Sequence, residues 1–353
     1  MKTVAVNAPN KIEIIDTPVP SPGPYQALVK TELACLCNNT DSELINGSFP
    51  GMEKAFPFAL GHESVGVVQE VGAKVRNFRP GGRALSGLVF DLGMEGLSSG
   101  WGGFCEYVLA NDHEAMVEDG VADEEHGWVE VFEIQTPLDP DIDPADAVLL
   151  CTWREVLGAF RDFRLQPGDD ILVFGGGPVG LSFVKLGRLF GLGWIGMVDR
   201  HPEKRDSATA FGADAVFDRD DPALPELPET RGKKLDAVID AVGKPELISA
   251  GLPLLKRGGS MCVYGFYAGL KEFTVPNALA DYNFNLLVHQ WPTRLYEKEA
   301  QGPLCDWIRA GKLSGKEFIT HRFPINQIGD AFEAVRRRKV IKALLTCDGT
   351  ASA

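Results

Sequence analysis

Residues 171–180, ILVFGGGPVG, place four apolar residues directly before a run of glycines. The apolar run is typical of a buried strand, and the residues after it have the apolar spacing of a helix. The glycines fit G-x-G-x-x-G, in which the first permits a tight turn, the second lets the backbone approach a pyrophosphate, and the third lets the helix pack on the strand. We therefore predict a dinucleotide-binding turn formed by Gly175, Gly177, Pro178, Val179 and Gly180.

A second strand-like segment ends in Asp199, nineteen residues beyond Gly180. A carboxylate at this point accepts hydrogen bonds from ribose hydroxyls and repels the 2′-phosphate of NADP, which favours NAD. Arg200 is the next residue, and a guanidinium there can hold that phosphate, so NADP is the alternative. We expect Asp199 and Arg200 to contact the cofactor, and NAD to be the preferred one.

The spacing of apolar and turn-forming residues changes twice along the chain. Residues 1–148 contain short alternating runs rich in Val, Ile and Thr, broken by Gly and Pro, which is typical of an all-β, barrel-like domain. Residues 149–287 alternate between strand-like and helical segments, which predicts a parallel, doubly wound sheet. From residue 288 the regular alternation of strand-like and helical segments ends. Two helical segments and a strand follow. The expected fold class is α/β with two domains.

The amino-acid composition limits the kinds of partner that this chain can bind. The 353 residues include 35 Lys and Arg against 49 Asp and Glu, so the net charge is −14. Such a surface repels phosphate backbones, and we expect no nucleic-acid partner. No apolar run reaches the ~18 residues of a membrane span, and the N-terminus lacks the pattern of a signal peptide, so no membrane association and a cytoplasmic location are expected. Seven scattered cysteines favour free thiols or metal ligands over disulfides.

The acidic residues are unevenly placed. Residues 114–148 contain twelve Asp or Glu and no Lys or Arg. A charge run of this kind is usually a solvated loop or an insertion, which is what we expect here.

Four residues of metal-binding type are spread over the first half of the chain. Cys37 is followed 25 residues later by His62 and Glu63, and Cys151 lies 89 residues after His62. Cysteine, histidine and carboxylate side chains suit Zn²⁺. No local spacing joins them, however, and a lone cysteine or histidine is more often a buried core residue. The residues alone leave both interpretations open.

Residues 61–85, GHESVGVVQEVGAKVRNFRPGGRAL, resemble the signature G-H-E-x-x-G-x-V-x-x-V-G of the zinc-dependent medium-chain dehydrogenase/reductase family, the alcohol and polyol dehydrogenases. CNNTD at 37–41 resembles the C-G-[ST]-D of that family, and the resemblance extends over essentially the whole chain. It implies a GroES-like β-barrel catalytic domain over 1–148, completed by 288–353, and a Rossmann NAD(P)-binding domain over 149–287. It also implies a homodimer or homotetramer.

The resemblance further implies an activity, hydride transfer between NAD(P) and a small-molecule alcohol, polyol or sugar hydroxyl, or the matching ketone. One catalytic zinc ion would be held by Cys37, His62 and Cys151, with Glu63 as a nearby carboxylate able to replace water as a ligand. Zinc at such a site acts as a Lewis acid on the alcohol oxygen.

The same resemblance implies a proton relay that starts at a hydroxyl beside the zinc cysteine. Thr40 is the matching residue, and Glu43 falls near the outer end of the relay, although a solvated carboxylate is an equal interpretation of Glu43. The family separates its cysteine from the hydroxyl residue by one position, whereas Asn38 and Asn39 both intervene here. The metal loop is therefore longer by one residue.

A second departure concerns a structural zinc site. The family usually holds this ion with four closely spaced cysteines, whereas residues 86–108 offer only Cys105, so we predict no structural zinc. Two alternatives to the dehydrogenase hypothesis remain. One is a zinc-independent NADPH-dependent enoyl or quinone reductase of the same superfamily, and the other is a non-catalytic nucleotide-binding protein with a sensing or structural role.

Overall fold

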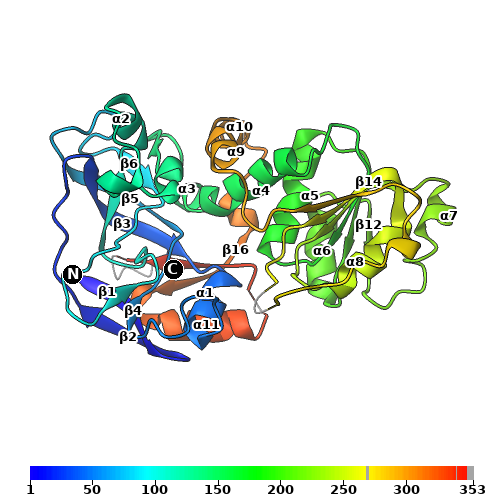
Figure 1. Cartoon of the computed structure of the whole chain (residues 1–353), viewed down its shortest axis with the longest axis horizontal. Helices are drawn as coiled ribbons and strands as arrows, with labels where there is room; N and C mark the ends of the chain where they lie inside the picture. Colours follow the sequence, from blue (N-terminus) through cyan, green and yellow to red (C-terminus); the bar gives the residue numbers. More distant parts are fainter. Residues whose placement is uncertain (268–269, 339, 348–353) are drawn as a thin grey trace. The chain divides into compact units, whose positions relative to one another are not determined.

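The computed structural model describes residues 1–267, 270–338 and 340–347. The chain forms two compact units, one made of Met1–Thr152 with Gln301–Ala353 and the other of Trp153–Ala300 (Figure 1). The sequence analysis expects the domain changes at residues 148/149 and 287/288. The two compact units meet within α4 (Leu150–Asp162), between Thr152 and Trp153, and after α9 (Arg294–Glu299), between Ala300 and Gln301.

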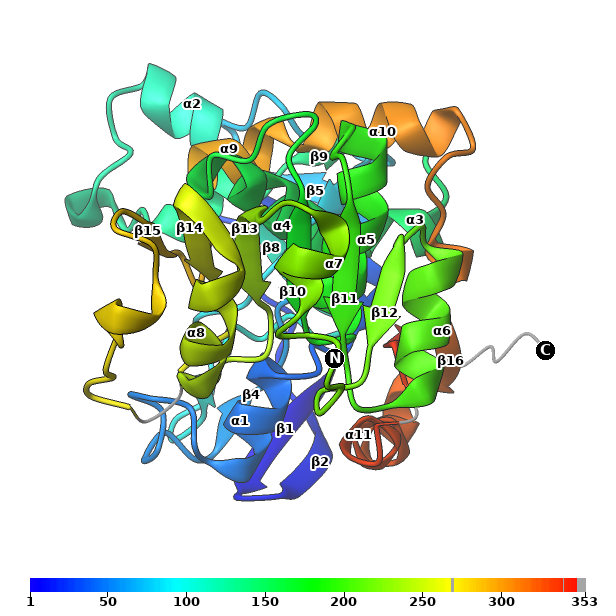
Figure 2. The same ribbon diagram turned by 90° about the vertical axis from the view of Figure 1, so that its right-hand side faces the viewer.

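The second unit is built on one parallel sheet of six strands. Their order is β12-β11-β10-β13-β14-β15, and every neighbouring pair is parallel. Figure 2 shows these strands in that order from right to left. Numbered along the unit, the order is 3-2-1-4-5-6, the order of a Rossmann fold, so the predicted fold class is confirmed. The strands are β10 (Ile171–Phe174), β11 (Ile195–Val198), β12 (Ala215–Phe217), β13 (Leu235–Asp240), β14 (Leu255–Val263) and β15 (Asn285–Val288).

Helices cover both faces of this sheet. All four residues of β10 are buried, as expected for a central parallel strand. Leu172 and Phe174 share a core cluster with Leu227 of α7 and Ile248 of α8, while α5 packs on the face to which Val173 belongs. Besides α4 and α9, the helices of this unit are α5 (Pro178–Phe190), α6 (Pro202–Ala210), α7 (Leu227–Arg231) and α8 (Glu246–Gly251).

The first unit contains two sheets. The larger has the order β16-β17-β3-β5-β6-β9, with β8 also paired to β3, and the smaller has the order β2-β1-β4-β7. Strand β3 is central, because β17 pairs on one side of it and β5 on the other. The strands are β1 (Lys2–Ala8), β2 (Lys11–Asp16), β3 (Gln26–Cys35), β4 (Phe58–Ala59), β5 (Ser64–Val71), β6 (Arg83–Leu85), β7 (Ser98–Ser99), β8 (Tyr107–Asn111), β9 (Pro137–Leu138), β16 (Ile319–Pro324) and β17 (Lys342–Thr346).

Short helices close this unit, and two of them share its main core. Leu44 of α1 and Val335 of α11 belong to the same buried cluster as Val4, Leu36 and Leu345. The core therefore joins the two ends of the sequence. The helices are α1 (Thr40–Asn46), α2 (His113–Glu118), α3 (Pro144–Ala147), α10 (Gln301–Arg309) and α11 (Ile328–Arg336).

The acidic segment 114–148 is more ordered than a solvated loop. It contains short helical turns and β9, and Phe132 and Ile134 are buried. Two of its carboxylates, Asp139 and Asp141, pair with Arg309 of α10. Its charge is thus partly compensated from a distant part of the sequence.

Among the described residues, no helix combines the length and the apolar character needed to cross a membrane.

Candidate metal centre and dinucleotide cradle

The glycine turn after β10 has no room for a side chain at Gly175 or Gly180, whereas a Cβ at Gly177 would meet no atom within 4 Å. Gly175 adopts a φ of 104°, and a Cβ there would lie 2.7 Å from Val242 Cγ2. A Cβ at Gly180 would lie 1.7 Å from the carbonyl oxygen of Gly175, so the turn and α5 can approach this closely only with glycine. Gly177 caps α5 and Pro178 begins it, which leaves N–H groups of the first turn available to a phosphate.

Asp199 follows β11 and is tied to the glycine turn. Its Oδ2 accepts a hydrogen bond from the backbone N–H of Gly176 at 2.7 Å, and its Oδ1 accepts one from the N–H of His201 at 2.8 Å. Arg200 donates from Nε to His201 Nε2 at 3.1 Å. The structure therefore brings the predicted ribose-binding carboxylate to the predicted pyrophosphate-binding turn.

Sequence reasoning missed Asp240, the last residue of β13. Its fully buried carboxylate accepts hydrogen bonds from the N–H groups of Val242, Gly243 and Lys244, and from the Tyr267 hydroxyl at 3.0 Å. These bonds fix the loop that contacts Gly175. Cofactors bind at the carboxyl ends of strands where the strand order reverses, which is between β10 and β13 here. The sequence signal that could have identified it is an aspartate at the end of an apolar, strand-like segment, residues 235–240.

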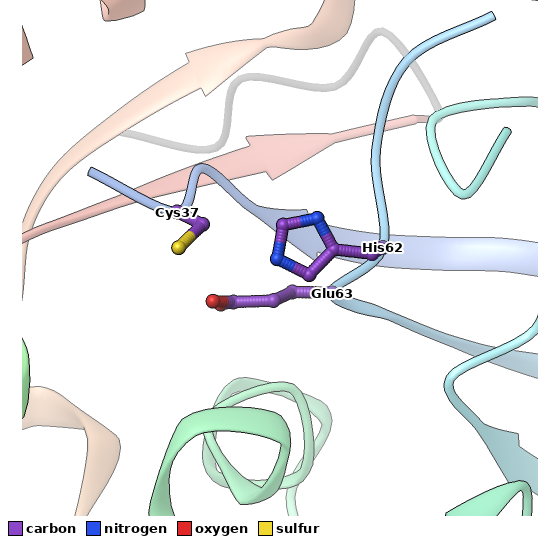
Figure 3. Close-up of side chains that lie close together, drawn as sticks. All are labelled: Cys37, His62 and Glu63. Atoms are coloured by element: carbon purple, nitrogen blue, oxygen red, sulfur yellow. The ribbon is translucent and has the colours of Figure 1, made fainter. Parts of the chain in front are cut away.

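In the first unit, Cys37, His62 and Glu63 form a cluster of potential metal ligands. One donor atom from each lies within 4.8 Å of the others. Figure 3 shows the three side chains converging, with one ring nitrogen of His62 facing the other two. Cys37 follows the end of β3, whereas His62 and Glu63 precede β5, and the pairing of these strands brings them together. Gly61 before them has a φ of 107°, and a Cβ there would lie 2.2 Å from Phe104.

Asp41, in the first turn of α1, supports two of these residues. It is completely buried, and its Oδ2 accepts a hydrogen bond from the backbone N–H of Cys37 at 2.8 Å. Its Oδ1 lies 3.3 Å from His62 Nδ1. Burial would lower the pKa of His62, but Asp41 and Cys37 outweigh it and raise that pKa well above its ordinary value. Sequence analysis included Asp41 in the CNNTD motif but gave it no role.

Glu63 is held by a buried lysine. Lys342, the first residue of β17, places Nζ 2.8 Å from Glu63 Oε1 and 2.5 Å from Oε2. The side chains are only 2% and 5% exposed, respectively. Thr152 Oγ1 also donates to Oε1 at 3.3 Å. Burial would lower the pKa of Lys342, but the charge of Glu63 outweighs it and raises that pKa. No sequence motif pointed to Lys342.

Cys151 lies outside the group of three. It is the second residue of α4 and is 6% exposed. Its Sγ lies 3.4 Å from Ser86 Oγ. Cys35 is completely buried in β3, and burial raises the pKa of its thiol far above the ordinary value. Cys105 is buried as well and accepts a hydrogen bond from Thr3 at 3.4 Å.

The two predicted relay residues lie on α1. Thr40 is its first residue and is half-buried, and Glu43 lies three positions later, at a spacing that places both on neighbouring parts of the helix surface. Burial raises the pKa of Glu43, against the opposing effect of a hydrogen bond from Asn39 Nδ2 at 3.3 Å. Glu43 Oε2 is buried without a hydrogen-bond partner.

The donor set fits a zinc ion. Thiolate, imidazole and carboxylate are the ligand types that Zn²⁺ takes in proteins. Ligand histidines usually direct their second nitrogen at a carboxylate, and Asp41 occupies that place beside His62. His62 Nδ1 and Asp41 Oδ1 are both buried and have no other polar partner among the described residues, so they face each other at 3.3 Å and leave the second ring nitrogen of His62 for a metal.

Two parts of the chain match known sequence families. Residues 178–293 match the sequence family described as zinc-binding dehydrogenase, and residues 23–118 match the alcohol dehydrogenase GroES-like domain. An alcohol dehydrogenase of Cupriavidus necator is 28% identical, with 97% of each chain covered.

Solved structures agree in fold along the whole chain. An alcohol dehydrogenase from Escherichia coli CFT073, complexed with NADH, has a TM-score of 0.78 at 22% identity and covers 98% of this chain and 99% of its own. The 2R,3R-butanediol dehydrogenase of Bacillus subtilis also has a TM-score of 0.78, at 20% identity and the same coverage.

Proposed function

Because the chain belongs to the zinc-dependent medium-chain dehydrogenase/reductase family, we propose that it oxidises an alcohol, polyol or sugar hydroxyl, or reduces the matching ketone, with NAD(P) as the hydride carrier. The observation that carries this proposal is the convergence of Cys37, His62 and Glu63 in the first unit. A reductase of activated double bonds has no use for this set of ligands.

The metal site is assigned as follows. Cys37, His62 and Cys151 hold one catalytic zinc ion, and Glu63 is a carboxylate that can join them. When bound, zinc supplies Lewis acidity to the alcohol oxygen. Asp41 orients His62 and fixes the backbone at Cys37, so that both donors are in place before the ion binds. Cys105 alone offers too few ligands for a second, structural ion.

Proton transfer is assigned to α1. Thr40 takes the proton of the alcohol through its hydroxyl and passes it outward, and Glu43 accepts it at the outer end. The raised pKa of Glu43 suits this role, because a general base works best when its pKa approaches the operating pH. The additional residue in the metal loop places Asn38 between Cys37 and the relay, where its Nδ2 donates to the Ile341 carbonyl at 3.1 Å.

The cofactor is assigned to the second unit. The N–H groups at the start of α5 receive the pyrophosphate, with Gly175, Gly177 and Gly180 making the close approach possible. Asp199 receives the ribose hydroxyls, and its charge selects NAD over NADP. Arg200 is the residue through which NADP would bind.

Metal analysis and a substrate screen test this proposal together. We expect about one zinc ion per chain and NAD-linked oxidation of at least one alcohol, polyol or sugar. Cys37→Ala should remove the zinc and the turnover but leave NADH binding intact, whereas Cys35→Ala, two residues earlier on β3, should keep both. About two zinc ions would contradict the absence of a structural site. No zinc would favour the zinc-independent reductase or the non-catalytic alternative.

Assembly and location complete the proposal. We expect a homodimer or homotetramer in the cytoplasm, as in the interpretation of the sequence. Light scattering of the purified protein measures the first, and fractionation of cells that express it measures the second.

A further inference from the structure

Trp101, two residues after β7, has a backbone conformation that tryptophan rarely adopts. Its φ is 69°, in the left-handed region where a bulky side chain is strained. Strain of this kind persists only where the surrounding structure imposes it, and it concentrates at functional sites. The position of Trp101 in the first unit therefore requires an explanation.

The backbone around Trp101 is held against the segment that leads to the metal centre. Gly103 donates its N–H to the Gly61 carbonyl at 2.6 Å, and a Cβ at Gly103 would lie 2.8 Å from that oxygen. The Trp101 carbonyl accepts the N–H of Val89 at 2.9 Å. Because Gly61 directly precedes His62, these bonds fix Trp101 relative to one of the proposed metal ligands.

The ring of Trp101 lies against the ring of His62. Their centroids are 5.3 Å apart and their planes make an angle of 65°. Phe49, three residues after α1, packs edge-on against Trp101, with centroids 5.7 Å apart and planes at 84°. Both Phe49 and Trp101 contact the main core of the unit but are only partly buried. An aromatic surface thus adjoins the metal centre at His62.

We propose that Trp101 is a specificity-determining residue, which with Phe49 forms an apolar wall beside the metal centre and selects alcohols that carry an aromatic group over polyols and sugars. This inference rests on the proposed function and narrows its substrate class. A substrate ring against the indole gains apolar contact and a favourable edge-on or offset arrangement. A polyol chain in the same place turns hydroxyl groups toward carbon atoms and loses hydrogen bonds with water.

Direct binding measurements test the wall without relying on turnover. The probes are benzyl alcohol and xylitol, titrated into the zinc-loaded protein with NADH bound, in which the reduced cofactor prevents oxidation. Ligand-observed NMR gives both dissociation constants, and metal analysis checks that each variant keeps its zinc.

Three variants separate the ring from its backbone. Trp101→Asn removes the ring and suits a positive φ, whereas Trp101→Phe retains an aromatic ring. Phe90→Ala removes a 47% exposed ring from the same segment, residues 86–103, and is the matched control.

The two probes should respond differently. Wild type should bind benzyl alcohol more tightly than xylitol. Trp101→Asn should weaken benzyl alcohol binding by about ten- to thirtyfold, because the ring contact is lost, and should change xylitol binding by less than about threefold. The ratio of kcat/KM for benzyl alcohol to that for xylitol should fall by a similar factor. Trp101→Phe should retain most of the preference, and Phe90→Ala should behave as wild type does.

Three results would overturn the proposal. Wild type could bind xylitol more tightly than benzyl alcohol. Trp101→Asn could weaken both probes equally, which would show that the ring only supports His62. Trp101→Asn could also bind benzyl alcohol more tightly, which would show that the indole fills the space that a substrate ring needs. If Trp101→Asn does not fold, Trp101→Gly, which permits the same φ, replaces it with the same expectation.

Failure of this inference is distinct from failure of the proposed function. A protein that binds zinc and oxidises alcohols, but shows no preference that depends on Trp101, contradicts this inference alone. A protein that binds no zinc and oxidises no alcohol contradicts the proposed function, and the inference fails with it.

Discussion

The side chain of Asp199 accepts a hydrogen bond from the backbone N–H of Gly176 at 2.7 Å. The residue proposed to select the cofactor by its ribose is therefore tied to the turn proposed to receive the pyrophosphate. The second Asp199 oxygen accepts the N–H of His201, so both oxygens already hold the backbone in place. Under the proposed function, cofactor choice and the shape of the phosphate cradle are linked through this one carboxylate.

This link predicts the effect of two substitutions. Asp199→Ala should lower kcat/KM with NAD relative to NADP by about ten- to a hundredfold, because the repulsion of the 2′-phosphate is lost while Arg200 remains. Asp199→Asn should also shift the preference but retain more NADH affinity, since its amide oxygen can still accept the Gly176 N–H. Steady-state kinetics with both cofactors measure the ratio, and the exposed Asp206→Ala is the control. An unchanged ratio would assign cofactor selection elsewhere.

Asp41 gives a prediction about metal affinity. Asp41→Asn removes the charge beside His62 and should weaken zinc binding by about ten- to a hundredfold, because outer carboxylates fix the orientation and basicity of ligand histidines. Competition with a colorimetric chelator measures the constant. Ser42→Ala, the next residue along α1, loses only a hydrogen bond to the Asn38 carbonyl and should bind zinc as wild type does. Equal weakening in both variants would point to damage of the helix as a whole.

Thr40 gives a prediction about the proton. Thr40→Val keeps the shape of the side chain but removes the hydroxyl, and we expect kcat to fall about 10²- to 10⁴-fold with zinc content unchanged. Thr40→Ser keeps the hydroxyl and should retain most of the activity. Pre-steady-state measurement of NADH formation, together with metal analysis, separates the two effects. Normal turnover in Thr40→Val would remove Thr40 from the relay while leaving the metal assignment in place.

Asp170, just before β10, gives a prediction about stability and pH. Burial opposes its ionisation, but Lys233, the Trp194 N–H and Arg231 outweigh it and lower the pKa of the carboxyl to about 2. An unfolded aspartate has a pKa near ~3.9, so the stabilisation is complete above that value and is lost as the pH falls through about 2.

The change is about 1–2 kcal/mol, once the exposed position of Lys233 is allowed for. Asp170→Asn should therefore be less stable than wild type from pH 5 to 7, and the gap should narrow between pH 4 and 3. Denaturant unfolding at a series of pH values measures it. A gap that stays constant down to pH 3 would show that the paired charge is not its source.

The sequence predicted the second unit well because its signals are local. A buried strand, a glycine turn and a helix lie next to one another between residues 171 and 190, and the turn needs glycine for steric reasons that any chain shares. Details at element ends were less predictable. Two helices, α3 and α4, lie on either side of the expected domain boundary at 148/149, and the acidic segment expected as a solvated loop contains buried Phe132 and Ile134.

The metal centre was predictable only as far as its motif reached. His62 and Glu63 are adjacent, and Cys37 is near enough for a family signature to include it. Lys342 and Glu63 are separated by 279 positions, and neither periodicity nor spacing connects them. The residues 342–347 were recognisable as a strand, but which neighbour its first side chain would meet depended on the pairing of β17, β3 and β5.

That separation has a consequence for how the first unit holds together. β17 and β5 lie on opposite sides of β3 in one sheet, and Glu63 directly precedes β5. The buried ion pair therefore ties these two outer neighbours of β3 to each other. Separating β17 from β3 would leave the Glu63 carboxylate buried without its cation, so the strand pairing and the charge balance of the candidate metal centre are lost together.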